Sequence, residues 1–252
     1  LRLNVFSGKE KTYQAWNGID EKTLALNRRY NGAGTEKPGE PYGNETDNYT
    51  QTHYQLFYNH KFSEKWKSNI AFFLTRGKGY YEQYKAGESF SKYGLPDVIQ
   101  GADTITQTDL VRQLWLDNYF YGSIFSLQYQ QPNTQLIIGG GWNRYDGNHF
   151  GEIIWTDVKN AAPTGYRWYD LDARKTDGSL FVKWTEKLTD HWQTFIDLQA
   201  RAVQYRINGF RDNPTLRINN QYVFFNPKAG VRYTKNKTSW YLSYARGAKE
   251  PN

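Results

Sequence analysis

Apolar and polar residues alternate along two adjoining stretches of the chain, residues 117–130 and 135–145. A period of two gives a β-strand one apolar face and one polar or small-residue face. Between the stretches, Gln131-Pro132-Asn133 favours a tight turn, because proline fixes φ and asparagine tolerates turn geometry. We therefore predict an antiparallel hairpin whose apolar face carries Tyr119, Tyr121, Phe125, Leu127, Tyr129, Leu136, Ile138, Gly140 and Trp142, with Phe120 and Ile124 as exceptions on the polar face.

The same alternation recurs in other parts of the chain and predicts about nine strands. Residues 1–7 read as one strand. Further hairpins are predicted from the apolar positions Tyr54, Leu56, Tyr58, Phe62, Trp66, Ile70, Phe72 and Leu74; Leu180, Val182, Trp184, Trp192, Ile196, Leu198, Ala200 and Ala202; and Pro227, Ala229, Val231, Tyr233, Trp240, Leu242 and Tyr244.

The connections between these strands alternate between very short and long. Short turns are predicted at residues 63–65, 131–133, 188–191 and 235–237. Long excursions are predicted at 8–48, 76–113, 146–177 and 208–220, the first with a short helix from Asp20, an N-cap candidate, to Arg29. Transmembrane barrels have short periplasmic turns and long extracellular loops. The pattern predicts an all-β, antiparallel up-and-down meander that forms part of a large transmembrane β-barrel.

Aromatic residues lie close to the short turns, where a barrel carries its interfacial girdle. We expect membrane-interface positions for seven of them, namely Phe62, Trp66, Tyr129, Trp184, Trp192, Tyr233 and Trp240. The polar faces carry charges such as Lys61, Lys67, Asp197 and Arg201, which a large barrel would wet or cover with a plug. An odd strand count is unusual for a closed bacterial barrel, so we expect a piece of a bigger one.

Composition narrows the possible classes of protein. The chain has 252 residues, aromatic residues make up 17% of it, and its mean hydropathy is −0.85. No stretch approaches the ~20 apolar residues of a membrane helix, so any spanning must be done by strands. Cysteine is absent, which excludes disulfides and thiolate metal sites. The net charge of +7 comes from interspersed bases and acids without a basic run, so nucleic-acid binding is not expected.

Catalytic and metal motifs are not found in the sequence. The histidines His53, His60, His149 and His191 have no metal-ligand spacing, so we expect no metal site. A phosphate loop needs a lysine followed by Ser or Thr at the start of a helix, and neither glycine-rich segment, at residues 76–79 or 139–141, offers that. We interpret them as strand glycines that mark bends or close backbone approach. No nucleophile motif appears, and we predict no enzyme activity and no cofactor.

Aromatic and cationic residues gather in the predicted extracellular excursions. Such a mixture can stack on and hydrogen-bond a large ligand at a barrel mouth. The candidate ligand-binding residues are Trp16, Arg76, Tyr80, Tyr81, Tyr84, Trp155, Arg167 and Trp168. The alternative for each is that it packs the loops against one another.

Five segments carry a resemblance to a known family, the TonB-dependent receptors of Gram-negative outer membranes, in their Bacteroidetes form. They are GKEKTYQAWNGI (residues 8–19), NETDNYTQTHYQLFYNHKF (44–62), TRGKGYYEQYK (75–85), FNPKAGVRY (225–233) and YARGAKEPN (244–252). The resemblance covers essentially all of residues 1–252 and lies within the barrel domain. Nothing in the chain resembles the plug, the TonB box or the terminal barrel strand.

The resemblance implies a parent barrel of ~22 strands with an N-terminal plug in the outer membrane. Such a receptor imports a scarce, large nutrient, such as an iron–siderophore complex, haem, cobalamin or an oligosaccharide. The TonB complex supplies the energy and would be contacted through the plug region. The alternative from another class is a soluble or surface-attached carbohydrate-binding β-sandwich. In that case Leu56, Ile70, Phe125, Leu136 and Leu198 would be buried between two stacked sheets.

Overall fold

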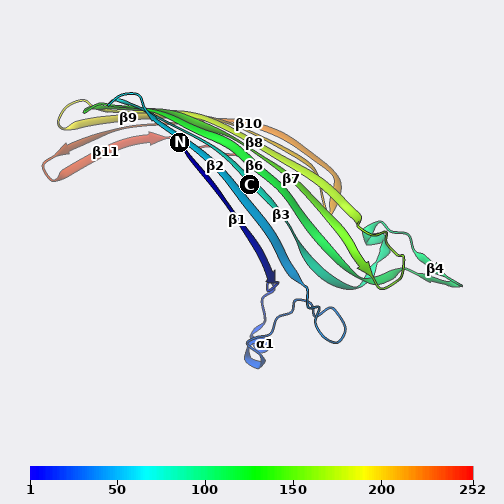
Figure 1. The fold of residues 1–252 in the computed structure, drawn as a ribbon. Helices are drawn as coiled ribbons and strands as arrows, with labels where there is room; N and C mark the ends of the chain where they lie inside the picture. The colour runs from blue at the N-terminus through cyan, green and yellow to red at the C-terminus, as the bar shows by residue number, and fades with distance from the viewer. Residues whose placement is uncertain (252) are drawn as a thin grey trace.

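A computed structural model describes residues 1–251 and shows one nine-stranded antiparallel sheet, strongly curved, whose strands follow one another in chain order apart from the separate hairpin β4–β5 (Figure 1). The strands of this sheet are β1 (Arg2–Tyr13), β2 (Thr46–Lys61), β3 (Trp66–Ser89), β6 (Gln107–Gln130), β7 (Thr134–Thr156), β8 (Tyr166–Lys187), β9 (Trp192–Phe210), β10 (Asn213–Lys235) and β11 (Thr238–Ala245). The predicted all-β meander of about nine strands is confirmed. β1 and β11 are the two edges, so the sheet is an open, curved wall.

The second predicted architecture, a sandwich, is not observed. Besides the nine-stranded sheet, the described residues contain only the two-stranded sheet of β4 (Val98–Gln100) and β5 (Asp103–Ile105). Leu56, Phe125 and Leu198 have exposed fractions of 37%, 41% and 40%. These side chains therefore do not lie between two stacked layers.

Four short turns lie at one end of the sheet, which we call the turn end, and the long loops emerge at the other, the loop end. The turn end carries the connections at residues 62–65, 131–133, 188–191 and 236–237. Each of these closes a strand pair through backbone hydrogen bonds, for example from Phe62 N to Trp66 O at 3.0 Å and from Gln131 N to Thr134 O at 2.8 Å. The predicted short turns are confirmed.

The strands run much further toward the loop end than predicted. β3 and β6 have 24 residues each and β7 has 23, so most of the excursions 76–113 and 146–177 is paired strand, and the loops shrink to 90–106 and 157–165. The polar sequence suggested loops there, but each of these strand ends is paired with at least one neighbouring strand. Backbone hydrogen bonds across the sheet satisfy these polar stretches as well as apolar ones.

The loop predicted at residues 208–220 is wrong, and with it the strict alternation of connection lengths. β9 and β10 are joined by Arg211 and Asp212 alone. Gly209 has φ +99°, a conformation that glycine adopts without strain, and it lies beside a register shift between Asn213 and Arg217. This irregularity lets the chain reverse direction in a small number of residues. Asn, Asp and Pro are typical of loops, so the sequence did not indicate that β9 and β10 pair here.

The loop end contains the only sizeable buried core of the described residues. Phe90, Tyr93, Leu95, Leu110, Ile153 and Ala161 form it. The one-turn helix η1 (Phe90–Tyr93) supplies its two largest side chains. In the loop at 14–45, Asp20 caps the helix α1 (Glu21–Leu26) by accepting a hydrogen bond from Thr23 N at 2.8 Å, which confirms the predicted cap. Neither helix among the described residues is long and apolar enough to cross a membrane.

The turn between β10 and β11 offers a test of the hairpin geometry. Asn236 has φ +53°, which asparagine tolerates and a β-branched residue does not. We expect Asn236→Val to destabilise the hairpin by about 1–3 kcal/mol and Asn236→Gly to be tolerated. The midpoint of denaturant-induced unfolding of the chain in detergent micelles measures both, and equal midpoints for the two variants would contradict the assignment of the turn.

Candidate functional site

The register of the sheet joins the alternating positions of all nine strands into two continuous faces. One row runs from Ile70 through Phe125, Gly140 and Leu180 to Ala200 on neighbouring strands. We call the face that contains this row the apolar face, and the opposite face, with Asn59, Asn69, Ser126 and Gln199, the polar face. Large side chains on the apolar face are strongly exposed, for example Leu3 65%, Phe72 54%, Leu180 61%, Val223 74% and Leu242 74%.

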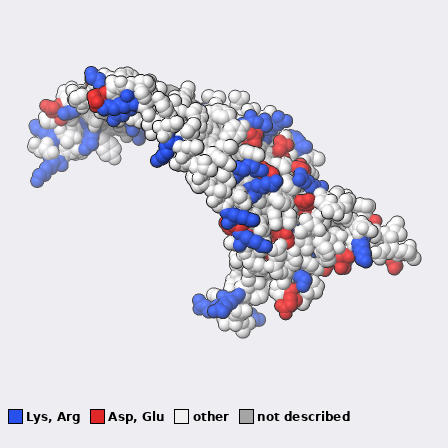
Figure 2. All heavy atoms as spheres, viewed as in Figure 1, with Lys and Arg blue, Asp and Glu red and all other residues white. Residues whose placement is uncertain are grey.

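The apolar face carries a band without charged residues. On β3 it covers the alternate positions of residues 66–74 before Arg76, and on β7 those of 136–142 before Arg144. Nine residues span about 27 Å along a strand, close to what a strand needs to cross a bilayer. In the view of Figure 2, charged side chains gather toward the two ends of the sheet, and a mostly uncharged zone separates them.

Six of the seven predicted interface aromatics lie on the apolar face near the turn end, and the seventh, Phe62, lies in a turn at that end. Trp66 packs on Tyr129, with ring centroids 4.8 Å apart, and Trp192 packs on Tyr233 at the same distance. Trp240 pairs with Tyr233 in register, and Trp184 pairs with Leu136. Phe62 lies in the first short turn with an exposed fraction of 63%. Their role at a membrane interface stays a prediction, and their common location is what that role requires.

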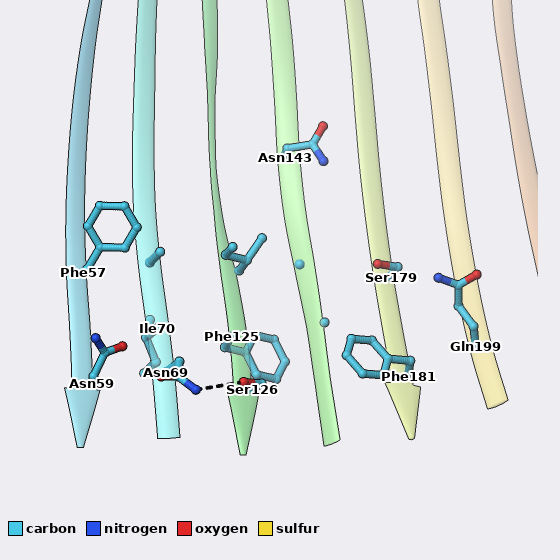
Figure 3. Close-up of a pocket in the computed structure, with 14 residues that line it drawn as sticks. Phe57, Asn59, Asn69, Ile70, Phe125, Ser126, Asn143, Ser179, Phe181 and Gln199 are labelled. Carbon is cyan, nitrogen blue, oxygen red and sulfur yellow. Dashed lines mark hydrogen bonds between the residues drawn. The ribbon is translucent and has the colours of Figure 1, made fainter. Parts of the chain in front are cut away.

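The polar face has a hollow of about 520 Å³ near the middle of the sheet (Figure 3). Phe57 from β2 and Phe181 from β8 lean over the strands between them, which contribute the small residues Ala71 and Ser126. Asn69 donates a hydrogen bond to the Ser126 hydroxyl at 3.3 Å on its wall. A floor of small side chains between two rings leaves room for a chain segment or ligand to approach the backbone.

Two residues of the glycine run 139–141, Gly140 and Gly141, line this hollow. These residues lie inside β7, as predicted, and a Cβ atom on Gly139 would lie 2.7 Å from the Phe181 ring. Glycine is therefore required for the close approach of that ring. The segment at residues 76–79 likewise lies inside β3. Neither segment opens a helix, so the phosphate-loop geometry is absent from both.

Charges on the polar face are paired close to the sheet. The Glu250 carboxylate accepts hydrogen bonds from Arg201 Nη1 at 2.7 Å, Lys175 Nζ at 3.0 Å and the Tyr205 hydroxyl at 3.0 Å. Arg201 also forms an ion pair with Asp177. Glu250 belongs to the family-like segment at 244–252, of which Asn252 lies outside the described residues. The segment thus turns back over β8 and β9 and is fixed there by charge.

The structure does not bring the eight candidate ligand-binding residues together. Only Trp16 lies in a loop, and the other seven lie in the long ends of β3, β7 and β8, which corrects their predicted location. Their contacts separate them into different groups. Arg76 forms an ion pair with Asp117, and the Tyr80 ring packs on Trp115. The Tyr84 hydroxyl donates a hydrogen bond to Asp109, and its ring centroid lies 6.1 Å from that of Trp155. The Arg167 guanidinium lies over the Phe150 ring, Trp168 packs on Tyr93, and Trp16 packs edge to face on Tyr81.

A second hollow of the polar face, about 390 Å³, lies at the loop end, and we call it the rim hollow. Tyr81, His149, Tyr169 and Arg211 are among its lining residues. Burial raises the pKa of Tyr169 to about 12 and lowers the pKa of His149, so both are neutral near pH 7. The rim hollow thus brings three neutral or aromatic rings together with the guanidinium group of Arg211. Sequence analysis missed Arg211, because nothing in the sequence links it to Tyr81 on β3, which it joins only in the folded sheet.

The loop at 14–45 is tied to the sheet through one buried carboxylate, Glu82 on β3, whose exposed fraction is 3%. Glu82 accepts hydrogen bonds from the Tyr42 hydroxyl at 2.6 Å, Asn44 Nδ2 at 2.5 Å and Gln113 Nε2 at 2.7 Å. Its backbone oxygen accepts a further bond from Gln14 Nε2 at 2.9 Å. The loop is therefore a fixed part of the rim. Among residues 1–251 no group of three or more His, Asp or Glu side chains could hold a metal ion.

Comparison with known proteins gives a consistent result. The family described as "TonB dependent receptor-like, beta-barrel" matches residues 2–252. The chain is similar to the crystal structure of the ferric-catecholate import receptor Fiu from E. coli K12, with a TM-score of 0.52 and 11% identity over 96% of this chain and 40% of that chain. It is also similar to the siderophore receptor PiuA from Acinetobacter baumannii, with a TM-score of 0.55 and 12% identity over 96% of this chain and 39% of that chain. The chain thus spans about two fifths of these receptors. No curated protein matches it.

The Glu82 cluster predicts how the first long loop is held. Glu82→Ala leaves three partly buried hydrogen-bond donors without their acceptor, and each such loss costs about 1–3 kcal/mol. We expect faster hydrogen exchange and proteolysis within residues 14–45, with β6 and β7 unchanged. Glu10→Ala, which removes an exposed carboxylate bonded to Thr12, is the matched control and should change neither. Unchanged protection of the loop in Glu82→Ala would contradict the anchor.

Glu45, at the end of the same loop, predicts a dependence on pH. Burial raises its pKa, although the backbone amides of Gly34 and Tyr84 and the charge of Lys85 act in the opposite direction, and its Oε2 atom is buried without a hydrogen-bond partner. Because the folded state holds the proton more tightly, the stability it contributes is complete below the ordinary glutamate pKa of about 4.3. That contribution is lost as the pH rises through the raised pKa.

We expect the protection of residues 14–45 against hydrogen exchange, corrected for the intrinsic rate, to fall between about pH 4 and pH 7. Glu45→Gln, which cannot ionise, should remove this dependence and protect the loop better at pH 7. A wild-type loop with constant protection over this range would show that the carboxylate is solvated.

Proposed function

Because the chain belongs to the family of TonB-dependent receptor-like β-barrels, we propose that it forms part of the wall of an outer-membrane receptor of the Bacteroidetes type. In this proposal residues 1–252 are a partial barrel domain, and the plug, the TonB box and the terminal strand belong to other parts of a longer protein. The share of the two siderophore receptors that the chain covers, about two fifths, supports this division.

The observation that carries the proposal is the uncharged band on the apolar face. It runs across neighbouring strands in register, its side chains are exposed, and interface aromatics border it at the turn end. Such a surface is unfavourable in water and favourable against lipid acyl chains. The hollows at Phe57 and at Tyr81 both lie on the opposite face, which would then line the lumen.

The transported nutrient is large and scarce in this proposal, and active uptake depends on energy from the TonB complex, which acts through the plug of the parent protein. An iron–siderophore complex, haem, cobalamin or an oligosaccharide fits this description. The two similar receptors are named for ferric-catecholate import and siderophore binding, which favours iron uptake among these options. Receptors of this family transport and do not catalyse, so we propose no enzyme activity.

Of the eight candidate ligand-binding residues, Trp16 and Tyr81 fit a role at the barrel mouth best. Their rings meet edge to face at 5.0 Å, and Tyr81 lines the rim hollow with Arg211. Arg76, Tyr80 and Arg167 belong to the side of the sheet that carries the apolar face, and Tyr84 is buried. These four are therefore better explained by packing and by surface charge.

A matched pair of substitutions tests which face meets lipid. Leu180, near the middle of the band, is exposed on the apolar face, and Ser179 beside it lines the hollow of the polar face. An arginine at the centre of a lipid-facing strand costs about 2–4 kcal/mol. We expect Leu180→Arg to abolish assembly of the chain into phosphatidylcholine bilayers and Ser179→Arg to be tolerated.

Assembly is measured by protease protection and by the shift in gel mobility on heating. If both variants assemble equally, or if the wild-type chain stays in solution as a folded monomer without detergent, the receptor proposal fails. The second outcome would restore the soluble carbohydrate-binding protein as the better hypothesis.

A further inference from the structure

Three arginines on three neighbouring strands mark the loop-end border of the uncharged band. Arg144 on β7, Arg174 on β8 and Arg206 on β9 are the first charged residues beyond the band on the apolar face of their strands. Arg174 pairs in register with Asp146 on one side and with Arg206 on the other. Arg144 precedes Asp146 by two residues, so all three side chains emerge within one small area, which we call the arginine cluster.

The arginine cluster holds more positive charge than its own carboxylate neutralises. Asp146 accepts from Arg144 Nε at 2.8 Å and from Arg174 Nε at 2.7 Å. Arg206 is exposed and forms no ion pair within residues 1–251. Three positive charges against one negative charge leave a net charge of +2. Arg174 and Arg206 face each other across the sheet, and like charges in that position are destabilising.

Beyond the arginine cluster each further carboxylate is accompanied by a further arginine, because Asp172 lines a hollow with Arg206 and Arg217. Toward the loop end, Asp172 accepts a hydrogen bond from Asn208 Nδ2 at 2.7 Å. Asp170 pairs with Arg167 at 2.8 Å. On β3 and β6 the same border continues with Arg76 and Lys78 around Asp117, at 2.5 and 3.3 Å, again two cations for one carboxylate. The border is therefore cationic along several strands.

The surroundings of the arginine cluster are amphipathic. Trp142, immediately below Arg144 on the apolar face, has an exposed fraction of 43%, and its ring meets Tyr121 edge to face at 5.9 Å. The Tyr121 hydroxyl donates to Asp146 Oδ2 at 3.1 Å. Rings of this kind sit where acyl chains give way to headgroups. A group bound to the three guanidinium groups would therefore lie directly beside the apolar surface of the band.

We propose that the arginine cluster binds the phosphate of an anionic membrane lipid whose acyl chains cover the band below it. Guanidinium groups pair with phosphate oxygens through two parallel hydrogen bonds and lose little hydration in doing so, which makes arginine the suitable residue. Binding would relieve the repulsion between Arg174 and Arg206. The inference rests on the proposed function, because it requires the apolar face to lie against lipid.

The test uses the full chain assembled in phosphatidylcholine nanodiscs and titrated with diphosphorylated lipid A, with binding followed by native mass spectrometry. Arg144→Gln, Arg174→Gln and Arg206→Gln are combined in one variant. We expect its affinity for the phosphorylated lipid to fall at least about tenfold, as for the loss of charge-assisted hydrogen bonds. The corresponding triple lysine variant, which keeps the charge and loses the paired geometry, should bind with intermediate affinity.

The matched control removes three positive charges from the opposite edge of the band, by Lys65→Gln, Lys235→Gln and Lys237→Gln, and should bind as the wild type does. Three results would each overturn the proposal. They are equal binding of dephosphorylated lipid A, displacement of the bound lipid by inorganic phosphate, and wild-type affinity in the triple glutamine variant. Assembly in phosphatidylcholine alone tests the proposed function separately, so a chain that assembles without selecting the phosphorylated lipid refutes only this inference.

Discussion

The inter-strand register is the constraint on which the rest of the structure depends. A slip of one residue in any pair would move that strand's apolar side chains to the opposite face. Here Ile70, Phe125, Gly140 and Leu180 stay aligned across four strands, and the polar positions stay aligned behind them. The band, both hollows and the arginine cluster are products of this one alignment, because none of them is formed by a single strand.

The sequence allowed the turn end to be predicted well and the loop end poorly, for a physical reason. Near the turn end each strand alternates between lipid-facing and lumen-facing residues in the proposed arrangement, so a period of two is visible in residues such as Trp66 and Ile70. Beyond the band both faces meet water or other protein. Residues such as Asp146 and Asn208 are in strands only because neighbouring strands pair with them, and their composition does not predict a strand.

The same reason explains the outcome for the candidate site. Tyr84 and Trp168 were predicted as candidate ligand-binding residues among aromatic and cationic neighbours, but their partners, Asp109 and Tyr93, come from segments that only the folded loop end brings near. The rim hollow combines Tyr81 on β3 with Arg211 between β9 and β10. No local pattern links residues so far apart, whereas the interface aromatics repeat at each of the four turns of the turn end and could be found from spacing alone.

The length of the strands has a consequence for how a ligand would be received. β3 and β6 have 24 residues, and a bilayer needs about half of them, so in the proposed arrangement the remainder would stand above the membrane as hydrogen-bonded sheet. Glu82 fastens the first loop to this upper sheet. This upper sheet and its attached loop are already ordered before a ligand binds. Binding then has a smaller cost in conformational entropy.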